Sequence, residues 1–567
     1  MTRKLLAFSS VVLACLNSSP TQAAVFTWTG AGANNSWSTL ANWQGGVAPP
    51  ANTTDTVVEF AGTTRLTNDQ NIANKLALNG VIFAANAGNN LVGGFNLTGM
   101  PISLVADAGN NPKITNNTTS GAAANTISLN AEFQDPTTIT GNGTSNLVLS
   151  GALAGGSGFT MDSGNFSLVL SGTASNGYGG TTTVNSGTVI LNKGANGTTA
   201  IPGDLVIGNG AATSLVEMRG FSQQIGMVNN GVGNSNVTIA RNGTLRIANS
   251  FAANTALVDR IATLSGAGNV ELGTGTGGGQ PGRNTLFTGG KGADSPFSGT
   301  ISGTGNLVKL GGNVLVLSGQ NTYTGSTTVG FREAGVTRDG GVLTVTGSIG
   351  SMANKSGAVT VLRGTLDGNG TIFTAGPTRG VTIDAGGKIK PKGGSPGILT
   401  IGSGGFAMLD GSEFEVEIDR GASGPVACNG AGCYSQLRVV DGTILEGGAL
   451  TLVLDSGVQV GDLFAIIDNL DDVPVTGTFA SLAQGATFHA GFDGFDYLFQ
   501  IGYDGNAISP SQVSFTGGND VVLRVIAAAP VPEPAPMLSL LVGLGALFGA
   551  LRTRRSSAAA PIASARR

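Results

Sequence analysis

Residues Gly303–Gly347 read GTGNLVKLGGNVLVLSGQNTYTGSTTVGFREAGVTRDGGVLTVTG, and parts of this stretch recur elsewhere in the chain. The pentapeptide LVLSG occurs three times, at Leu147–Gly151, Leu168–Gly172 and Leu315–Gly319. The first two copies start 21 residues apart. A short apolar segment that returns at such a spacing and ends in a glycine turn is typical of a solenoid, in which each repeat forms one coil.

The surroundings of two of these copies also match. Tyr178–Val184 reads YGGTTTV, and Tyr323–Val329 reads YTGSTTV. Leu-Val-Leu and Thr-Thr-Val are short β-forming runs, and the adjoining Ser-Gly and Thr-Gly pairs favour turns. A strand this short cannot bury its apolar side alone, whereas stacked coils form one continuous core. The repeats therefore predict an all-β fold, a right-handed parallel β-helix or a less regular β-solenoid.

Related strand phrases, each led by a glycine, occur at Gly187–Leu191, Gly243–Ile247, Gly341–Val345, Gly364–Leu366 and Gly397–Ile401. We divide the chain into N-terminal capping coils at 25–130, a β-helix at 131–383 and a small C-terminal β module at 384–526. A short hydrophobic helix is expected near the C-terminus, and residues 257–264 could form a short helical turn.

Gly303–Gly347 and the weaker copy Gly155–Leu191 resemble the autotransporter-associated β-strand repeat, which occurs in the β-helical passengers of bacterial surface proteins. The resemblance implies a stacked, extended, extracellular scaffold. It implies no particular chemistry, because members of that family are mostly adhesive, structural or unassigned.

Composition separates this chain from ordinary globular enzymes. Of 567 residues, 93 are glycine, and charged residues make up only 11%, against roughly a quarter in an average soluble protein. The formal net charge is −4. Without the two ends that we expect to be removed, 22 basic and 32 acidic residues remain, a formal charge of −10. An acidic surface without basic clusters argues against binding of nucleic acid or anionic lipid.

Residues 1–24 have the layout of a secretory signal peptide. Two basic residues precede the apolar run Leu5–Leu16, and a small-residue cleavage site follows just before Ala24. A lipoprotein site at Cys15 is the alternative. Leu13 is bulky where such sites prefer a small residue, so ordinary cleavage near Ala24 is the preferred interpretation.

The C-terminal tail combines a short motif, an apolar segment at 537–551 and a basic stop, formed by Val531, Pro532, Glu533, Pro534, Arg552, Arg554 and Arg555. Residues 531–556 resemble the PEP-CTERM sorting signal of Gram-negative bacteria. That resemblance implies an exosortase as sorting protease, transient anchoring in the inner membrane, release to the cell surface and an association with exopolysaccharide. Residues 557–567 extend beyond the usual end of that signal. A permanent anchor is the alternative, although 15 apolar residues fall short of the roughly 20 that span a bilayer.

All three tryptophans, Trp28, Trp37 and Trp43, lie within the first coils of the expected mature chain. In one interpretation they form a cap that seals the open end of the solenoid, which would otherwise expose strand edges and core. In the other, their aromatic faces stack on sugar rings. The cap is preferred because terminal coils must be sealed whatever the protein does.

Three carboxylates, Glu413, Glu415 and Glu417, alternate with apolar residues and therefore share one face of a strand. They could bind Ca²⁺ or act on a glycan, but an ordinary solvated strand face shows the same pattern. Asp520 lies in a Gly-Gly-Asn-Asp sequence that matches half of a calcium-binding repeat, once only. We expect no metal and no other cofactor.

Cys428 and Cys433 lie in a glycine-rich loop between two predicted strands. Once the signal peptide is removed they are the remaining two cysteines, in an oxidising compartment, so we expect a disulfide between them.

No convincing catalytic constellation is present in the sequence, and we expect a protein without enzymatic activity. The single histidine, His489, excludes a histidine-dependent triad unless it is itself the base. The preferred function is a secreted, structural or adhesive surface or matrix protein associated with exopolysaccharide or biofilm. The alternative is a glycan-active β-helix enzyme, a lyase or a glycoside hydrolase. A pocket with several acidic residues and Lys or Arg would favour the enzyme, and a smooth Asn/Thr/Ser face would favour the scaffold.

Overall fold

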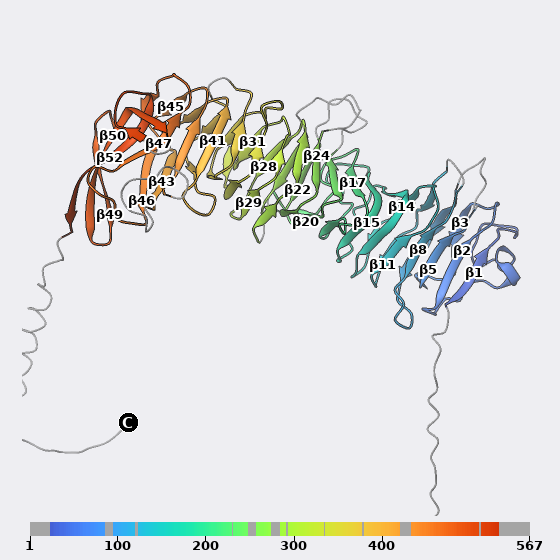
Figure 1. Cartoon of the computed structure of the whole chain (residues 1–567). Coiled ribbons are helices and arrows are strands. Elements are labelled where there is room, and N and C mark those ends of the chain that lie inside the picture. Colours follow the sequence, from blue (N-terminus) through green and yellow to red (C-terminus); the bar gives the residue numbers. More distant parts are fainter. Residues whose placement is uncertain are drawn as a thin grey trace, which may run out of the picture.

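The computed structural model describes residues 23–85, 94–119, 123–229, 231–247, 257–273, 284–290, 293–333, 335–376, 379–419, 433–509 and 512–531. The strands stack along one elongated, gently curved rod, with β1 (Ala24–Trp28) at one end and the C-terminal strands at the other (Figure 1). Most neighbouring strands pair in parallel, in sheets of up to 25 strands. The all-β parallel β-helix predicted from the sequence is confirmed.

Each coil crosses three faces in turn. The first face contains β1, β2 (Thr56–Phe60), β5 (Gly80–Phe83), β8 (Lys113–Asn116), β11 (Thr137–Thr140), the first parts of β14 (Phe159–Leu170) and β15 (Thr182–Leu191), β16 (Leu205–Ile207), β20 (Asn236–Ile239), β23 (Thr263–Gly266), β26 (Ser295–Phe297), β29 (Val314–Leu317), β34 (Val342–Val345), β37 (Gly364–Gly368), β40 (Gly387–Lys390), β43 (Glu413–Ile418) and β46 (Ala449–Leu454).

The second face contains β3 (Thr67–Gln70), β6 (Asn96–Gly99), β9 (Asn125–Ile127), β12 (Leu147–Leu149), the second parts of β14 and β15, β17 (Ser214–Met218), β21 (Gly243–Ile247), β24 (Asn269–Leu272), β27 (Thr300–Gly303), β30 (Gln320–Asn321), β35 (Ser348–Ile349), β38 (Thr371–Phe373), β41 (Ile398–Ser403), β44 (Gln436–Val439) and β47 (Leu463–Asn469). The long strands β14 and β15 bend across the corner and join the first two faces into one sheet.

The third face contains β4 (Leu76–Leu78), β7 (Ile102–Leu104), β10 (Ala131–Phe133), β13 (Leu153–Ala154), β22 (Val258–Ile261), β25 (Thr285–Thr288), β28 (Asn306–Lys309), β31 (Thr327–Val329), β36 (Val359–Val361), β39 (Val381–Ile383), β42 (Phe406–Met408), β45 (Thr443–Glu446) and β48 (Thr476–Thr478). Between β13 and β22 the described residues form no regular strands on this face, and single backbone hydrogen bonds connect the coils there. Two small hairpins branch from the rod, β18 (Val228–Asn229) with β19 (Val232–Gly233) and β32 (Phe331–Glu333) with β33 (Val336–Arg338).

The core consists of apolar side chains that stack from coil to coil. On the first face the inward-pointing residues pair in register across eight consecutive strands, in the order Val58, Val81, Ile114, Ile139, Met161, Val184, Ile207 and Ile239. Each is fully or almost fully buried. Such stacking is what allows strands of three to five residues to form a stable core, because each coil covers the apolar surface of the next.

The repeated motif occupies different faces in its different copies. Leu147 pairs with Leu168 on the second face, so the 21-residue spacing is one coil, as predicted. Leu315 lies instead on the first face, in β29. Tyr178 and Tyr323 are both buried, and each hydroxyl bonds to the threonine four residues later. The motif is therefore a strand-and-corner unit that fits more than one side of the coil, and coil length varies accordingly.

The only helical turns in the described ranges are η1 (Leu40–Asn42) and η2 (Gln44–Gly46), both in the N-terminal cap. The helical turn expected at 257–264 is wrong: β22 and β23 occupy this stretch, because neighbouring coils supply strand partners, β25 for β22 and both β20 and β26 for β23. The predicted hydrophobic helix at 537–551 lies outside the described residues. Within them, no helix is both long and apolar enough to cross a bilayer.

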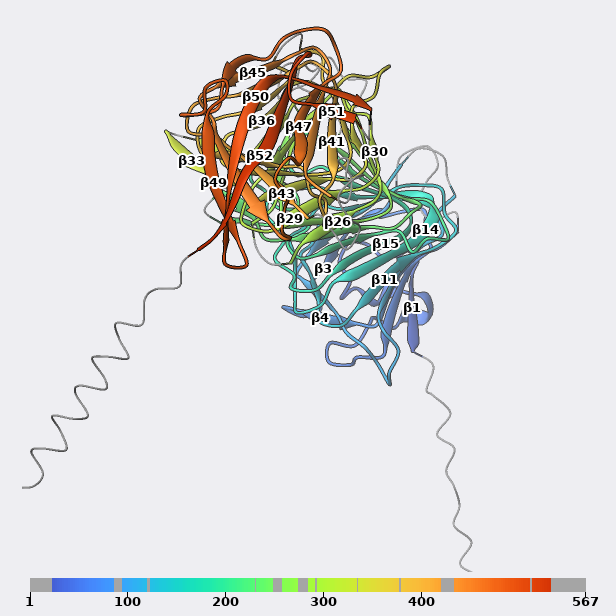
Figure 2. The ribbon, with the colours of Figure 1, turned by 60° about the vertical axis from the view of Figure 1, so that its left-hand side comes forward.

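Coil stacking continues without a break through residue 384, since β37, β40, β43 and β46 pair consecutively. Beyond β48 the pairing becomes antiparallel: β47 pairs with β52 (Asp520–Pro530), β52 with β50 (Phe495–Ser509), and β50 with β49 (Thr487–Phe492) and β51 (Gln512–Ser514). In both views these strands cover the C-terminal end of the rod and project from it (Figure 1, Figure 2).

Candidate functional site

Two open grooves follow corners of the rod. The first, here the arginine groove, has a volume of about 420 Å³ and includes Gly187, Thr188, Arg241, Thr244 and Arg246. It lies where β14, β15, β17, β21 and β24 begin their run along the second face. The second, here the mixed-charge groove, has a volume of about 400 Å³ and includes Asp339, Arg363, Gly364, Lys388 and Glu413. It lies where the chain enters the first face.

Glycines lie at strand starts along both grooves. In the arginine groove Gly187 lies in register with Ser214, and Ser214 with Gly243. In the mixed-charge groove Gly364 lies in register with Gly387. Gly364 has a φ of +123°, and a Cβ there would lie 2.6 Å from the Gly341 carbonyl oxygen of the preceding coil. The corner geometry therefore requires glycine at this position, because a side chain would meet the backbone of the neighbouring coil.

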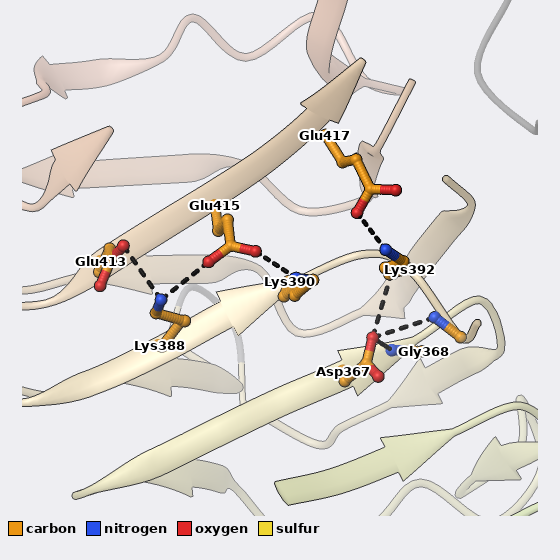
Figure 3. Close-up of polar contacts among 9 residues, drawn as sticks. Asp367, Gly368, Lys388, Lys390, Lys392, Glu413, Glu415 and Glu417 are labelled. Carbon is orange, nitrogen blue, oxygen red and sulfur yellow. Dashed lines mark hydrogen bonds and ion pairs between the residues drawn. The ribbon is translucent and has the colours of Figure 1, made fainter. Parts of the chain in front are cut away.

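The three glutamates singled out in the sequence belong to an ion-pair ladder beside the mixed-charge groove (Figure 3). Lys388 Nζ lies 3.1 Å from Glu413 Oε1 and 2.8 Å from Glu415 Oε2. Lys390 also contacts Glu415, and Lys392 contacts Glu417. The lysines on β40 and in the following turn therefore clamp β43, whose backbone pairs with β40 at only two positions.

Asp367, one coil earlier on β37, holds the turn that carries the last lysine of the ladder (Figure 3). Its Oδ1 accepts hydrogen bonds from the backbone N–H groups of Gly368, Lys392 and Gly393 at 2.7 to 3.2 Å. The ladder thus spans three coils and fixes their charged side chains in place.

The pKa values in this ladder follow from pairing and burial. Burial opposes ionisation of Glu415, but hydrogen bonds from Lys388 and Lys390 outweigh it and hold the pKa of Glu415 below its ordinary value. Burial also opposes the charge of Lys388, but its bonds to Glu415 and Glu413 leave the pKa of Lys388 raised. Carboxylates that are neutralised by lysines are poorly disposed to take a calcium ion. In the described part of the chain, no group of three or more His, Cys, Asp or Glu side chains is arranged to hold a metal ion.

Sequence reasoning overlooked the lysines. Lys388, Lys390 and Lys392 alternate with the same period of two as the glutamates and precede them by 25 residues, about one coil. An alternating row of one charge, followed one coil later by an alternating row of the other, was the signal that could have identified the ladder.

The remaining calcium candidate, Asp520, has a structural position at the C-terminal end. It is buried, and its two oxygens accept hydrogen bonds from the backbone N–H groups of Asn469 at 2.8 Å and Ala507 at 2.6 Å. Burial raises the pKa of Asp520 to about 6. These bonds join β52 to β47 and β50, so the carboxylate fastens the antiparallel strands to the last coils.

The three tryptophans lie inside the first coils. Trp28, Trp37 and Trp43 are 0%, 0% and 2% exposed. Trp43 packs edge-on against both of the other rings, at centroid distances of 5.2 and 5.8 Å. Trp37 Nε1 donates to Asn68 Oδ1 at 2.7 Å. No face of these rings is open to a sugar in this structure, and together they close the N-terminal end of the core.

Several other predicted features lie partly or wholly outside the described residues. Cys433 takes part in a disulfide, while Cys428 lies outside the described residues, so the pairing of these two cysteines stays a prediction. Val531 is the last described residue, and the rest of the sorting motif, Pro532, Glu533, Pro534, Arg552, Arg554 and Arg555, lies outside. So do residues 1–22 of the expected signal peptide, and Ala24 is already the first residue of β1.

His489 lies on the exposed strand β49, where its Nδ1 is 2.7 Å from Asp496 Oδ2. This pair faces solvent on the projecting C-terminal strands, apart from both grooves.

Comparison with known proteins gives one partial likeness. No protein-family model matches the chain. Over 261 residues, 41% of this chain, the sequence is 30% identical to a protein named Adhesin BmaC autotransporter from Brucella suis biovar 1 (strain 1330). The aligned part spans 7% of that much longer protein. Part of this chain is therefore similar to a segment of an autotransporter adhesin.

Proposed function

We propose that this chain is an exported surface protein with an adhesive or structural role, which holds polysaccharide or other surface components along the outside of its β-helix. The observation that carries this proposal is the pair of open, polar grooves at the corners of a continuous rod. Each groove runs from coil to coil, so an extended chain lying along the rod meets equivalent positions repeatedly. The similarity to a segment of an adhesin supports the adhesive role.

A glycan-active enzyme is the second candidate, and the mixed-charge groove is the observation in its favour. It combines two carboxylates, Asp339 and Glu413, with Arg363 and Lys388. The protonation of Lys388 argues against a lyase, since a general base needs a depressed pKa and that of Lys388 is raised. Glu413 is occupied by the same lysine. We therefore propose that the groove binds without cleaving.

The cellular localisation of the protein is also a proposal. β52 ends at Pro530, and Val531 follows it at the tip of the projecting C-terminal strands, where its N–H donates to the Gly494 carbonyl. The described chain thus reaches the start of the expected sorting motif on these projecting strands. We infer export, transient anchoring at the inner membrane, removal of the tail by an exosortase and release to the surface or matrix, with exopolysaccharide rather than nucleic acid as partner.

Two measurements on protein from its native host test these proposals. Intact mass and cell fractionation, with and without the sorting protease, should give an extracellular species that starts near Ala24 and ends near the Pro532–Pro534 motif. A full-length species retained in the inner membrane contradicts the sorting proposal.

Co-sedimentation with the host's own exopolysaccharide tests the binding role. We expect stable binding with no change in polymer length over hours. A steady appearance of new reducing ends or unsaturated sugars in the same mixture would instead establish the enzymatic alternative.

A further inference from the structure

The arginine groove differs from the mixed-charge groove in its charge. Arg241 and Arg246 both line it, and none of the described side chains that line it is a carboxylate. Arg246 is neutralised by Glu271, with Nε 2.6 Å from Oε2. On the neighbouring coil Arg219 pairs with Glu217 at 2.7 Å. The remaining charge in the groove is that of Arg241, on a chain whose body is acidic overall.

Arg241 is exposed and forms no ion pair with any described residue. It lies in the tight turn between β20 and β21, which Gly243 N closes by donating to Ala240 O at 2.7 Å. The next residue, Asn242, fastens this turn to the neighbouring coil: its side-chain amide donates to the carbonyls of Gly210 and Ala211, and its own carbonyl accepts from Ser214 N. The guanidinium therefore extends from a rigid base, which lowers the entropic cost of using it to bind a ligand.

The rest of the groove presents groups suited to hydroxylated ligands. Thr188 and Thr244 lie on β15 and β21, the strands on either side of β17, and both are half-buried and point outward. Asn269 adds an amide group to the lining. Hydroxyls and amides both donate and accept hydrogen bonds, as sugar hydroxyls require. An unpaired guanidinium among them adds a planar site for a carboxylate or sulfate.

We propose that the arginine groove binds acidic polysaccharide, with Arg241 as the residue that holds the carboxylate or sulfate of one sugar unit. This inference rests on the proposed polysaccharide-binding function and names its ligand class and its site. Net charge limits the affinity: an acidic protein repels an anionic polymer at long range, so binding depends on this local cation.

A matched pair of variants tests the assignment. Arg363 lies directly before Gly364 in the mixed-charge groove, which carboxylates, Asp339 and Glu413, also line. Polygalacturonate and its fully methyl-esterified form serve as probes, because they share a backbone and differ in charge. We expect the full chain to bind the acid form at least about tenfold more tightly than the ester. Arg241→Gln should abolish most of that preference, and Arg363→Gln should retain it.

The outcomes separate this inference from the function on which it rests. Equal binding of acid and ester forms, or an unchanged preference in Arg241→Gln, overturns the acidic-ligand assignment while leaving polysaccharide binding intact. Absence of binding to these probes and to the host's exopolysaccharide overturns both. Circular dichroism of each variant establishes that the β-helix is folded, and because Arg241 is exposed in a surface turn, its replacement should leave the fold unchanged.

Discussion

Replacing Asp259 by asparagine is expected to change how the stability of the β-helix depends on pH. Asp259 lies on β22 and is fully buried. Its Oδ1 accepts from Arg260 N at 2.9 Å and from Gln223 Nε2 at 3.2 Å, and its Oδ2 accepts from Ile225 N at 3.3 Å. The carboxyl thus accepts backbone N–H groups that a neighbouring strand would otherwise accept, at a place where the third face has no regular strand pairing.

Burial raises the pKa of Asp259 from 3.8 to about 8, although backbone hydrogen bonds from Arg260, Ile225 and Gln224 oppose this shift. Between these two values the folded state holds a proton that the unfolded state releases. The stabilisation by this group is therefore complete below about pH 4 and is lost as the pH rises to about 8. At 1.36 kcal/mol per unit of pKa, the loss has an upper limit of about 6 kcal/mol.

Asparagine at position 259 cannot ionise, so the variant does not lose stability at this position as the pH rises. Its amide nitrogen cannot accept from Ile225 N, which costs about 1 kcal/mol. We expect the two proteins to differ by about 1 kcal/mol or less near pH 5, and the variant to be more stable by several kcal/mol at pH 9.

Thermal unfolding followed by circular dichroism from pH 5 to 9 measures this difference. Solenoids can unfold in segments, so hydrogen exchange at the amides of Ile225 and Arg260 serves as the local readout. Asp162→Asn, which removes an exposed carboxyl, is the control and should follow the wild type. Parallel pH profiles for wild type and Asp259→Asn would refute the reasoning, because they would mean that this carboxyl is ionised in both states.

Further predictions concern the repeat, the corners, the ladder and the cap. Tyr323→Phe should cost about 1 kcal/mol, because it leaves the buried Thr327 hydroxyl without its partner; denaturant midpoints check this. Gly364→Ala should cost about 2 kcal/mol or more, since its φ is +123° and the new Cβ would meet a carbonyl oxygen; failure to lower the melting temperature would contradict the corner geometry. Glu415→Gln removes the partner of two lysines and should lower stability by about 1–2 kcal/mol in low salt and less in high salt. Trp43→Ala removes a ring that packs on two others and should cost about 3–5 kcal/mol, seen first as faster hydrogen exchange in the N-terminal coils; uniform exchange along the rod would contradict its role as a cap.

The sequence alone determined the kind of fold. Short apolar runs, glycine turns and the 21-residue return of LVLSG are local signals, and a coil of a β-helix is built from local signals. The register of Leu147 with Leu168 follows directly from that spacing. The aromatic cluster at the N-terminus could likewise be located, because three tryptophans in sixteen residues need burial somewhere.

Only the tertiary structure decided what each segment touches. Corner lengths vary, so Val270 pairs with Ile301, 31 residues later, and the same LVLSG motif lies on the second face in one part of the rod and on the first face in another. The alternating lysines were a signal for the ladder, but their individual contacts with Glu413, Glu415 and Glu417 depend on which coil lies alongside. The unpaired state of Arg241 depends on the neighbouring coil in the same way. The physical reason is that strand alternation and turn chemistry act within one coil, whereas pairing of charges and the hollow of a groove arise between coils, after their lengths have set the register.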